Sequence, residues 1–215
     1  MSDRVYTLDD PRPIAAEAPY TFFLPSPQEL SALAPGDLVK LIFRPLQLGD
    51  TWDSERMWVM IDAIHDDQMV GRLDNQPDEI PALQLGDIVE FERFQVIAVW
   101  WSMDRDEAPP NAPARRHYLE RCLVDRCVID DGIPVHFLDR DEPRATAEDA
   151  YPDSGWAIRG DYRGLSDAEL DAREFCFVSL GLVLNRDDSW LHLIDEPIGS
   201  AFIRDWESGR FVRAG

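Results

Sequence analysis

Two stretches of the sequence place a serine beside a glycine, with an aromatic residue, an arginine and an aspartate following. They read YPDSGWAIRGD at 151–161 and PIGSAFIRDW at 197–206. A serine nucleophile needs a histidine base within hydrogen-bond reach and donors for the oxyanion. Ser154 and Ser200 are the serines available for such chemistry. Neither stretch has the G-x-S-x-G spacing of a hydrolase elbow, and this argues against a serine enzyme.

The histidines that such a serine would need are His136 and His192, and both lie in strand-like sequence (PVHFL and WLHLI). A histidine in a strand is more often packed or on the surface than a base. The alternative that stays open is a small hydrolase or transferase with its site between two domains. That enzyme would use Ser154, one of the two histidines and Asp153 or Asp161.

Other chemistries have weaker support. His117, Cys122 and Cys127 are spaced five residues apart, whereas structural zinc sites favour ligand pairs separated by two to four residues. Pairs of neighbouring carboxylates fall in predicted turns, where aspartate bonds backbone amides. No phosphate-binding glycine motif is present. We therefore predict no metal, no cofactor and no enzyme activity.

The charge of the chain indicates which partners it would attract. Forty-two acidic residues against 21 basic ones give a net charge of −21. Such a field repels nucleic acid and anionic membranes and attracts basic proteins. The chain has no long apolar run and no signal-peptide pattern at its start, and its three cysteines cannot all pair. We expect a cytoplasmic protein; the sequence does not indicate its oligomeric state.

The pattern of elements predicts an α+β protein with two small domains, each a mainly antiparallel sheet with one or two helices. Residues 1–20 read as an extended arm, 21–101 as the first domain, 102–117 as a Pro-rich linker and 118–215 as the second domain.

In the first domain, Ser26, Pro27 and Glu29 predict a capped helix at 25–33. Strand-like sequence follows, with a hairpin loop expected at 65–68. The expected strands cover 37–43, 56–64, 69–75 and 87–101.

In the second domain, Ser166 and Glu169 predict one helix at 164–174. The remaining patterned segments are rich in β-branched and aromatic residues, which is typical of strands. The expected strands cover 118–129, 133–139, 155–161, 175–185, 189–194 and 200–206.

Seven tryptophans are distributed over both predicted domains. Tryptophan usually serves a core, but tryptophan and arginine also dominate binding hot spots, so we expect at least one exposed anchor. The tryptophans are Trp52, Trp58, Trp100, Trp101, Trp156, Trp190 and Trp206.

Several motifs resemble known families. ELSALAPGDLVKLIF, ERMWVMIDAI, VGRLDNQPDEI and LGDIVEF, within about 21–100, resemble a small bacterial domain family of unknown function. Within about 118–208, D-S-G-W at 153–156, a glycine with an acid at 160–161 and G-S-A-F-x-R-D at 199–205 resemble a bacterial immunity-protein family of polymorphic toxin systems. This resemblance implies a non-enzymatic protein-binding module that neutralises a toxin, and the acidic charge of the chain favours a basic toxin domain as its partner.

The residues that we expect to contact a partner come from the two opening stretches. Their glycines permit tight turns, and their aromatic residues anchor the strands that follow. The candidate partner-binding residues are Ser154, Trp156, Arg159, Asp161, Phe202 and Arg204.

Overall fold

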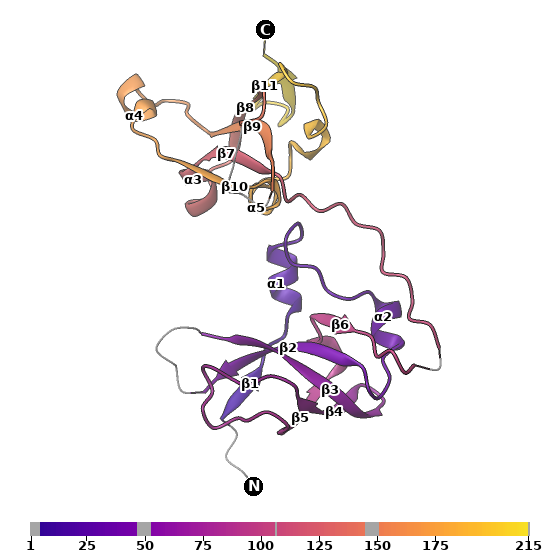
Figure 1. The fold of residues 1–215 in the computed structure, drawn as a ribbon. Helices are drawn as coiled ribbons and strands as arrows, with labels where there is room; N and C mark the ends of the chain where they lie inside the picture. The colour runs from indigo at the N-terminus through magenta and orange to yellow at the C-terminus, as the bar shows by residue number, and fades with distance from the viewer. Residues whose placement is uncertain (1–4, 47–52, 106, 145–150, 215) are drawn as a thin grey trace. The chain divides into compact units, whose positions relative to one another are not determined.

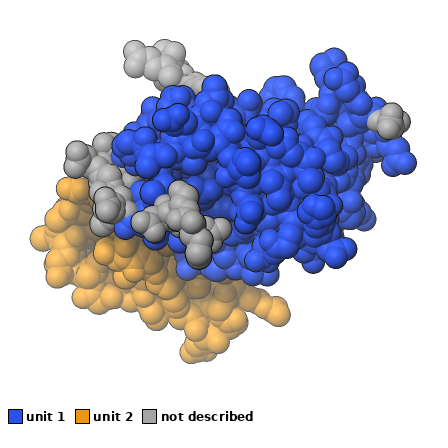
Figure 2. Space-filling view, turned by 90° about the horizontal axis from the view of Figure 1, so that it is seen from below, with its two compact units in different colours: residues 1–17, 22–115 blue, residues 18–21, 116–215 orange. Residues whose placement is uncertain are grey.

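A computed structural model describes residues 5–46, 53–105, 107–144 and 151–214. The chain forms two compact units, shown in different colours in Figure 2. Unit 1 comprises residues 1–17 and 22–115, and unit 2 comprises residues 18–21 and 116–215. The predicted α+β class is confirmed, because each unit is a mainly antiparallel sheet with a few short helices. The expected domain limits did not anticipate that residues 18–21 would belong to the second unit.

Among its described residues, unit 1 has six strands, two α-helices and one 3-10 helix. They are β1 (Tyr6–Leu8), α1 (Arg12–Glu17), α2 (Pro27–Ser31), β2 (Leu38–Pro45), β3 (Glu55–His65), β4 (Gln68–Leu73), β5 (Ile88–Glu92), η1 (Arg93–Gln95) and β6 (Ala98–Trp100). Figure 1 labels the strands and α-helices.

The sheet of unit 1 has the order β1-β2-β3-β4-β5, and β6 pairs with β2. All of its strand pairs are antiparallel. Because β6 returns to β2, the sheet curls around one apolar core. Alternate residues of β2 enter that core, and Val39, Leu41 and Phe43 are fully buried there.

Two local predictions for unit 1 are confirmed. Helix α2 has Ser26 as its N-cap, and a capping box joins Ser26 to Glu29. The β3–β4 hairpin closes through Asp66 and Asp67 between the paired residues His65 and Gln68. Asp66 has a φ of 57°, a left-handed conformation that aspartate tolerates better than most residues.

Two expectations for unit 1 were wrong. The first twenty residues are not a plain extended arm, because they contain β1 and α1. The expected strand at 87–101 is interrupted by η1, so that β5 pairs with β4 while β6 pairs with β2. The side chain of Gln95 fixes this turn: it accepts from the Glu92 amide at 2.8 Å and donates to the Leu8 carbonyl at 3.0 Å.

Unit 2 contains six strands, three α-helices and one 3-10 helix within the described residues. They are β7 (Arg121–Asp125), α3 (Arg126–Asp130), β8 (Val135–Arg140), β9 (Asp153–Gly160), α4 (Asp167–Asp171), β10 (Phe175–Ser179), α5 (Leu180–Leu184), η2 (Leu191–Leu193), β11 (Ala201–Arg204) and β12 (Phe211–Arg213).

The sheet of unit 2 has the order β10-β7-β9-β8-β11-β12. Its pairs are antiparallel except for β7 and β9, which run parallel. The two opening stretches therefore lie on β9 and β11, which flank β8. Helix α4 begins at the predicted cap, since Ser166 and Glu169 form a capping box.

Three expected strands of unit 2 end early or do not form. The segment 118–129 ends in α3, 175–185 ends in α5, and 189–194 contains only η2. The apolar run of α5 fits a buried strand as well as a buried helix, so periodicity does not separate the two. In the helix that forms, Ser179 is the N-cap, because its hydroxyl accepts the Leu182 amide at 3.3 Å.

Within the described residues, no helix combines the length and the apolar character that crossing a membrane requires.

Candidate partner-binding site

The two opening stretches converge on the end of β8. The Arg140 amide donates to the Ser200 carbonyl at 2.9 Å, and the Gly199 amide donates to the Arg140 carbonyl at 2.7 Å. On the other side of β8, the Asp141 amide donates to the Gly155 carbonyl at 2.9 Å. The D-S-G-W and G-S-A-F patterns thus hold β8 between them, which is a structural role.

Each polar residue of D-S-G-W has a backbone partner. Asp153 accepts the Gly155 amide at 3.0 Å and the Arg144 amide at 2.9 Å. The Ser154 hydroxyl donates to the Arg121 carbonyl at 2.7 Å and joins β9 to β7. Gly155 has a φ of 80°, and a Cβ there would lie 2.1 Å from the Asp141 carbonyl oxygen. Only glycine fits this approach of the two chains.

Trp156 and Phe202, two of the expected partner-binding residues, are in the core of unit 2. Their exposed fractions are 1% and 4%. The Trp156 indole nitrogen donates to the Ile194 carbonyl at 3.2 Å, and its ring meets Trp190 edge to face. Side chains this deeply buried present no surface to a partner, so their place in the pattern reflects the fold.

The structure does not bring Ser154 and His136 together. Ser154 is the second residue of β9, whereas the two residues that flank His136 pair with the last two residues of that strand. Strand residues rise by about 3.3 Å each, so roughly 15–20 Å separates the two positions. His192 lies in η2 and is exposed.

Arg159 pairs with a carboxylate distant in the sequence rather than with the nearby Asp161. It contacts Asp125 at 3.3 Å and lies over the Phe175 ring at 4.4 Å. Asp125 is fully buried, and it also accepts the Gly160 amide at 3.0 Å and pairs with Arg173 at 2.9 Å. A buried carboxylate with three partners fixes the end of β7 against β9.

Arg204 likewise pairs with a residue other than Asp205, its neighbour in the sequence. It contacts Asp187 at 2.5 Å, and Asp187 also accepts the Val135 amide at 2.8 Å. Asp205 instead accepts the Ser208 hydroxyl at 2.6 Å and shapes the turn between β11 and β12. Arg204 and Asp205 therefore both make their side-chain contacts with other residues of unit 2.

Around His136, side chains from three segments form a surface cluster. The Arg163 guanidinium lies 3.9 Å from the centroid of the Trp206 ring, and that of Arg204 lies 5.1 Å from it. His136 stacks on Tyr162 at 4.2 Å and meets Trp206 edge to face at 5.4 Å. We call this the aromatic–arginine cluster; its members are His136, Asp161, Tyr162, Arg163, Arg204 and Trp206.

The exposure of this cluster increases outward from His136. His136 is 4% exposed, Tyr162 and Trp206 are half-buried, and the Arg163 side chain is 53% exposed. The Trp206 indole nitrogen is buried and has no hydrogen-bond partner within the described residues. His136 is therefore the buried base of the cluster, and Arg163, stacked on Trp206, is its solvent-exposed side.

Burial favours a neutral His136, and the neighbouring Arg163 favours an ionised Asp161. Burial lowers the pKa of His136, and this outweighs the attraction of Asp161, whose Oδ1 lies 3.3 Å from the imidazole Nδ1. The hydrogen bonds of Arg163 lower the pKa of Asp161 to about 2. Asp161 therefore carries its charge across the physiological range and fixes Arg163 at 2.8 Å.

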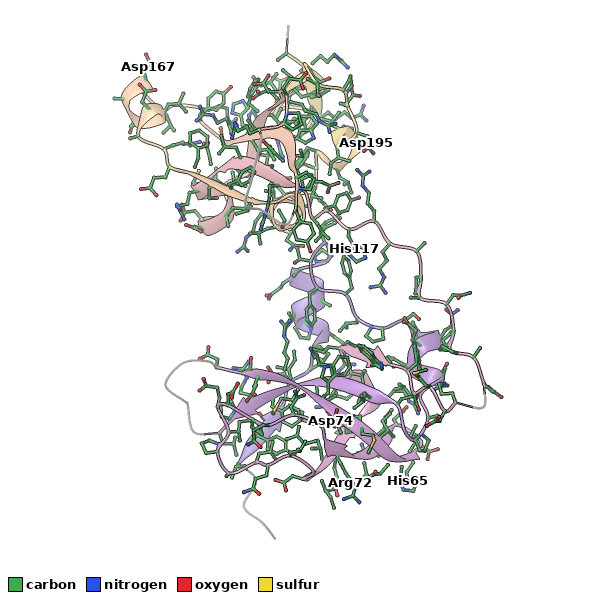
Figure 3. All side chains as sticks on the ribbon, in the orientation of Figure 1. His65, Arg72, Asp74, His117, Asp167 and Asp195 are labelled. Atoms are coloured by element: carbon green, nitrogen blue, oxygen red, sulfur yellow. The ribbon has the colours of Figure 1, made fainter. Side chains whose placement is uncertain are left out.

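Other charged contacts serve local structure. Arg116 donates twice to Asp195, at 2.6 and 2.7 Å, and lowers the pKa of that carboxyl (Asp195 is labelled in Figure 3). In unit 1, an open pocket beside α2 is lined by Arg93, whose guanidinium already bonds the Leu30 and Asp66 carbonyls. The guanidinium groups of Arg116 and Arg93 are therefore already hydrogen-bonded within the protein.

Sequence reasoning missed Tyr162, Arg163 and Trp206 as members of the surface cluster, although Trp206 directly follows G-S-A-F-x-R-D. An arginine and a tryptophan 43 positions apart give no periodic signal (206 − 163 = 43). Trp52, one of the tryptophans considered as an anchor, lies outside the described residues.

Comparison with protein families identifies the character of unit 2. Residues 122–214 match the family model of the immunity protein Imm33 domain. The match covers the sheet of unit 2 from β7 to β12 and no part of unit 1. No curated protein and no solved structure matches the chain. None of these findings supports the resemblance expected for residues 21–100.

Proposed function

We propose that this protein is a cytoplasmic immunity protein that binds a toxin protein and neutralises it without chemistry of its own. The observation that carries the proposal is the match of 122–214 to an immunity domain. Immunity by binding requires a stable scaffold and a complementary surface, and it needs no catalytic group. Unit 2 has a well-packed core. The hydroxyl of Ser154, the serine considered as a nucleophile, is hydrogen-bonded to the Arg121 carbonyl and lies far from His136.

The aromatic–arginine cluster is the surface that we propose for toxin binding. Tryptophan, tyrosine and arginine are the residue types most enriched at binding hot spots. Arg163 and Trp206 present a cation stacked on a ring, which can contact both apolar and acidic groups of a partner. The contacts below it, from Asp161 to Arg163 and from Asp187 to Arg204, hold the arginines in place and reduce the entropy lost on binding.

Among the residues first considered for partner binding, the structure supports a division of roles. Arg159, Asp161 and Arg204 are partly exposed and can border a bound partner. Ser154, Trp156 and Phe202 are buried and hold the fold of unit 2 together. We propose direct contacts for the first group only.

A basic toxin domain fits the electrostatics of the chain. The net charge of −21 would speed the approach of a cationic partner and would oppose binding to nucleic acid or anionic membranes. Local anchors would then decide how long the complex lasts, because most affinity differences between related complexes arise in the dissociation rate.

The test first asks whether a toxin gene lies beside the gene of this protein, and it uses the toxin that such a gene encodes. The toxin is co-expressed with the full chain, cell survival is scored, and the affinity of the purified pair is measured by calorimetry. Arg163→Glu and Trp206→Ala should each weaken binding at least about 10-fold, a loss of about 1.4 kcal/mol, which is typical of hot spots.

The matched control is Arg126→Ala on α3. Arg126 is 50% exposed and is ion-paired with Glu174, so it resembles Arg163 in exposure and pairing but lies outside the cluster. Its replacement should leave protection and affinity unchanged. Toxin binding that persists in both cluster variants would reject the proposed surface, and a chain that neither binds the toxin nor protects the cell would reject the function.

A further inference from the structure

A row of side chains crosses the outer face of the unit 1 sheet, in the part of the molecule that the immunity match does not cover. The row contains one residue from each of five strands, placed directly opposite one another by the strand pairing. Its members, in order across the sheet, are Trp100, Leu38, Met60, Arg72 and Ile88. Neighbouring strands lie about 4.8 Å apart, so the row is roughly 19 Å long.

Three members of this row are large apolar side chains open to solvent. The exposed fractions are 66% for Trp100, 63% for Ile88 and 40% for Met60. The next residues along the same strands, such as Val59 and Val89, point to the other face and are fully buried. The strand alternation therefore places apolar residues on both faces at this level of the sheet.

This arrangement differs from ordinary surface apolar residues, which occur singly. Here they come from β3, β5 and β6, and they share one line with the half-buried Leu38. Trp58, two residues from Met60 on the same face of β3, extends the row and lies 4.8 Å from the Lys40 ammonium. Arg72 separates Met60 from Ile88, but several large apolar side chains exposed on one face in this way mark an interaction site.

Charge next to the row indicates what the surface would accept. Arg72, labelled in Figure 3, is the only cation in the row, and Asp62 already pairs with it at 3.0 Å. Glu90 lies two residues from Ile88 on the same face of β5 and is exposed. Among the residues that the structure describes, Glu90 has no hydrogen-bond or ion-pair partner. The row thus has an unpaired carboxylate beside Ile88, at its β5 end, whereas the cations Lys40 and Arg72 on this face already lie against Trp58 and Asp62.

We propose that this row is a docking surface for a second protein, whose contact surface is an apolar patch bordered by lysine or arginine. The Trp100, Met60 and Ile88 side chains of the row contact the apolar patch of the partner. The carboxylate of Glu90 contacts the lysine or arginine residues that border this patch. A second copy of this chain fits less well, since each copy carries a net charge of −21. The same charge excludes nucleic acid. This function of unit 1 does not rest on the immunity function proposed for unit 2.

The test uses the full chain and an amphipathic peptide of leucine and lysine as the probe, with affinity measured by fluorescence and the contact surface mapped by amide NMR shifts. The peptide should shift amides of β2, β3, β5 and β6. Trp100→Ser and Met60→Ser should each weaken its binding at least about 10-fold. Because both side chains are exposed, the variants should melt at the parent temperature, which separates lost binding from lost folding.

The control Val212→Ser removes an apolar residue of unit 2 that is 49% exposed, and it should leave peptide affinity unchanged. So should Arg163→Glu, which tests the toxin surface of unit 2 separately. Three outcomes would overturn the proposal: equal affinity for a lysine-only peptide, unchanged affinity in the row variants, or a dimer of the parent chain that Trp100→Ser dissolves. The last would assign the row to self-association.

Discussion

At the scale of single residues, Trp156 and Trp100 have the same side chain in opposite surroundings. Trp156 is 1% exposed and Trp100 is 66% exposed. Replacing Trp156 by alanine should lower the free energy of unfolding by about 3–5 kcal/mol, because it removes a buried ring and leaves a cavity. Denaturant unfolding of the two alanine variants measures the difference.

Trp100→Ala is the matched control and should change stability by less than about 0.5 kcal/mol. A Trp156 variant as stable as the parent would mean that the ring is not part of the core, and it would return Trp156 to the set of partner-binding residues.

At the scale of elements, the segment Ala18–Thr21 acts as a strap on unit 2. The Tyr20 amide donates to the Asn185 side chain at 2.8 Å, the Tyr20 hydroxyl donates to Asp188 at 2.7 Å, and Asn185 donates to the Thr21 hydroxyl at 2.6 Å. The bond to Asp188 raises the pKa of Tyr20 to about 12. In the chain, the strap lies between the two segments of unit 1 (1–17 and 22–115), but it belongs to unit 2, so the two units are not simply successive.

Gly181 in α5 is the position at which the strap is most sensitive to substitution. A Cβ there would lie 2.9 Å from the Tyr20 carbonyl oxygen and 3.0 Å from a Thr21 methyl carbon. Gly181→Ala should therefore displace the strap and destabilise the protein by about 1–3 kcal/mol, although alanine favours a helix by about 1 kcal/mol. Hydrogen exchange of the strap amides and a thermal melt are the measurements.

Tyr20→Phe serves as the comparison, since it removes only the hydroxyl bond and should cost about 1–2 kcal/mol without displacing the backbone. If Gly181→Ala were more stable than the parent and its strap equally protected, the helix preference would have prevailed and the strap would be loosely held.

At the scale of the whole molecule, the net charge of −21 should control how quickly a basic toxin is captured. Electrostatic steering is screened within about 10 Å at 0.1 M salt. The association rate with the toxin should fall at least about 10-fold between 0.05 and 0.5 M NaCl, while the dissociation rate changes much less. Stopped-flow mixing separates the two rates. An association rate that does not depend on salt would indicate capture by local contacts alone.

Much of the fold could be predicted from local sequence. The capped helices at Ser26 and Ser166 follow from side chains that bond amides three residues away, and the hairpin at 65–68 follows from turn residues between two alternating segments. The same local reasoning failed at α3 and α5. Their apolar sequences suit either a buried strand or a buried helix, and only contacts with distant parts of the chain decide between the two.

The sequence by itself determined the acidic charge, the α+β class and the motifs that resemble an immunity-protein family, because composition, periodicity and short patterns are local properties. Only the tertiary structure decided what those motifs do. D-S-G-W and G-S-A-F hold β8 and fill the core, while Arg163 and Trp206, 43 positions apart, meet at the surface. The physical reason is that burial and side-chain contact depend on which strands become neighbours, and sequence spacing does not record that.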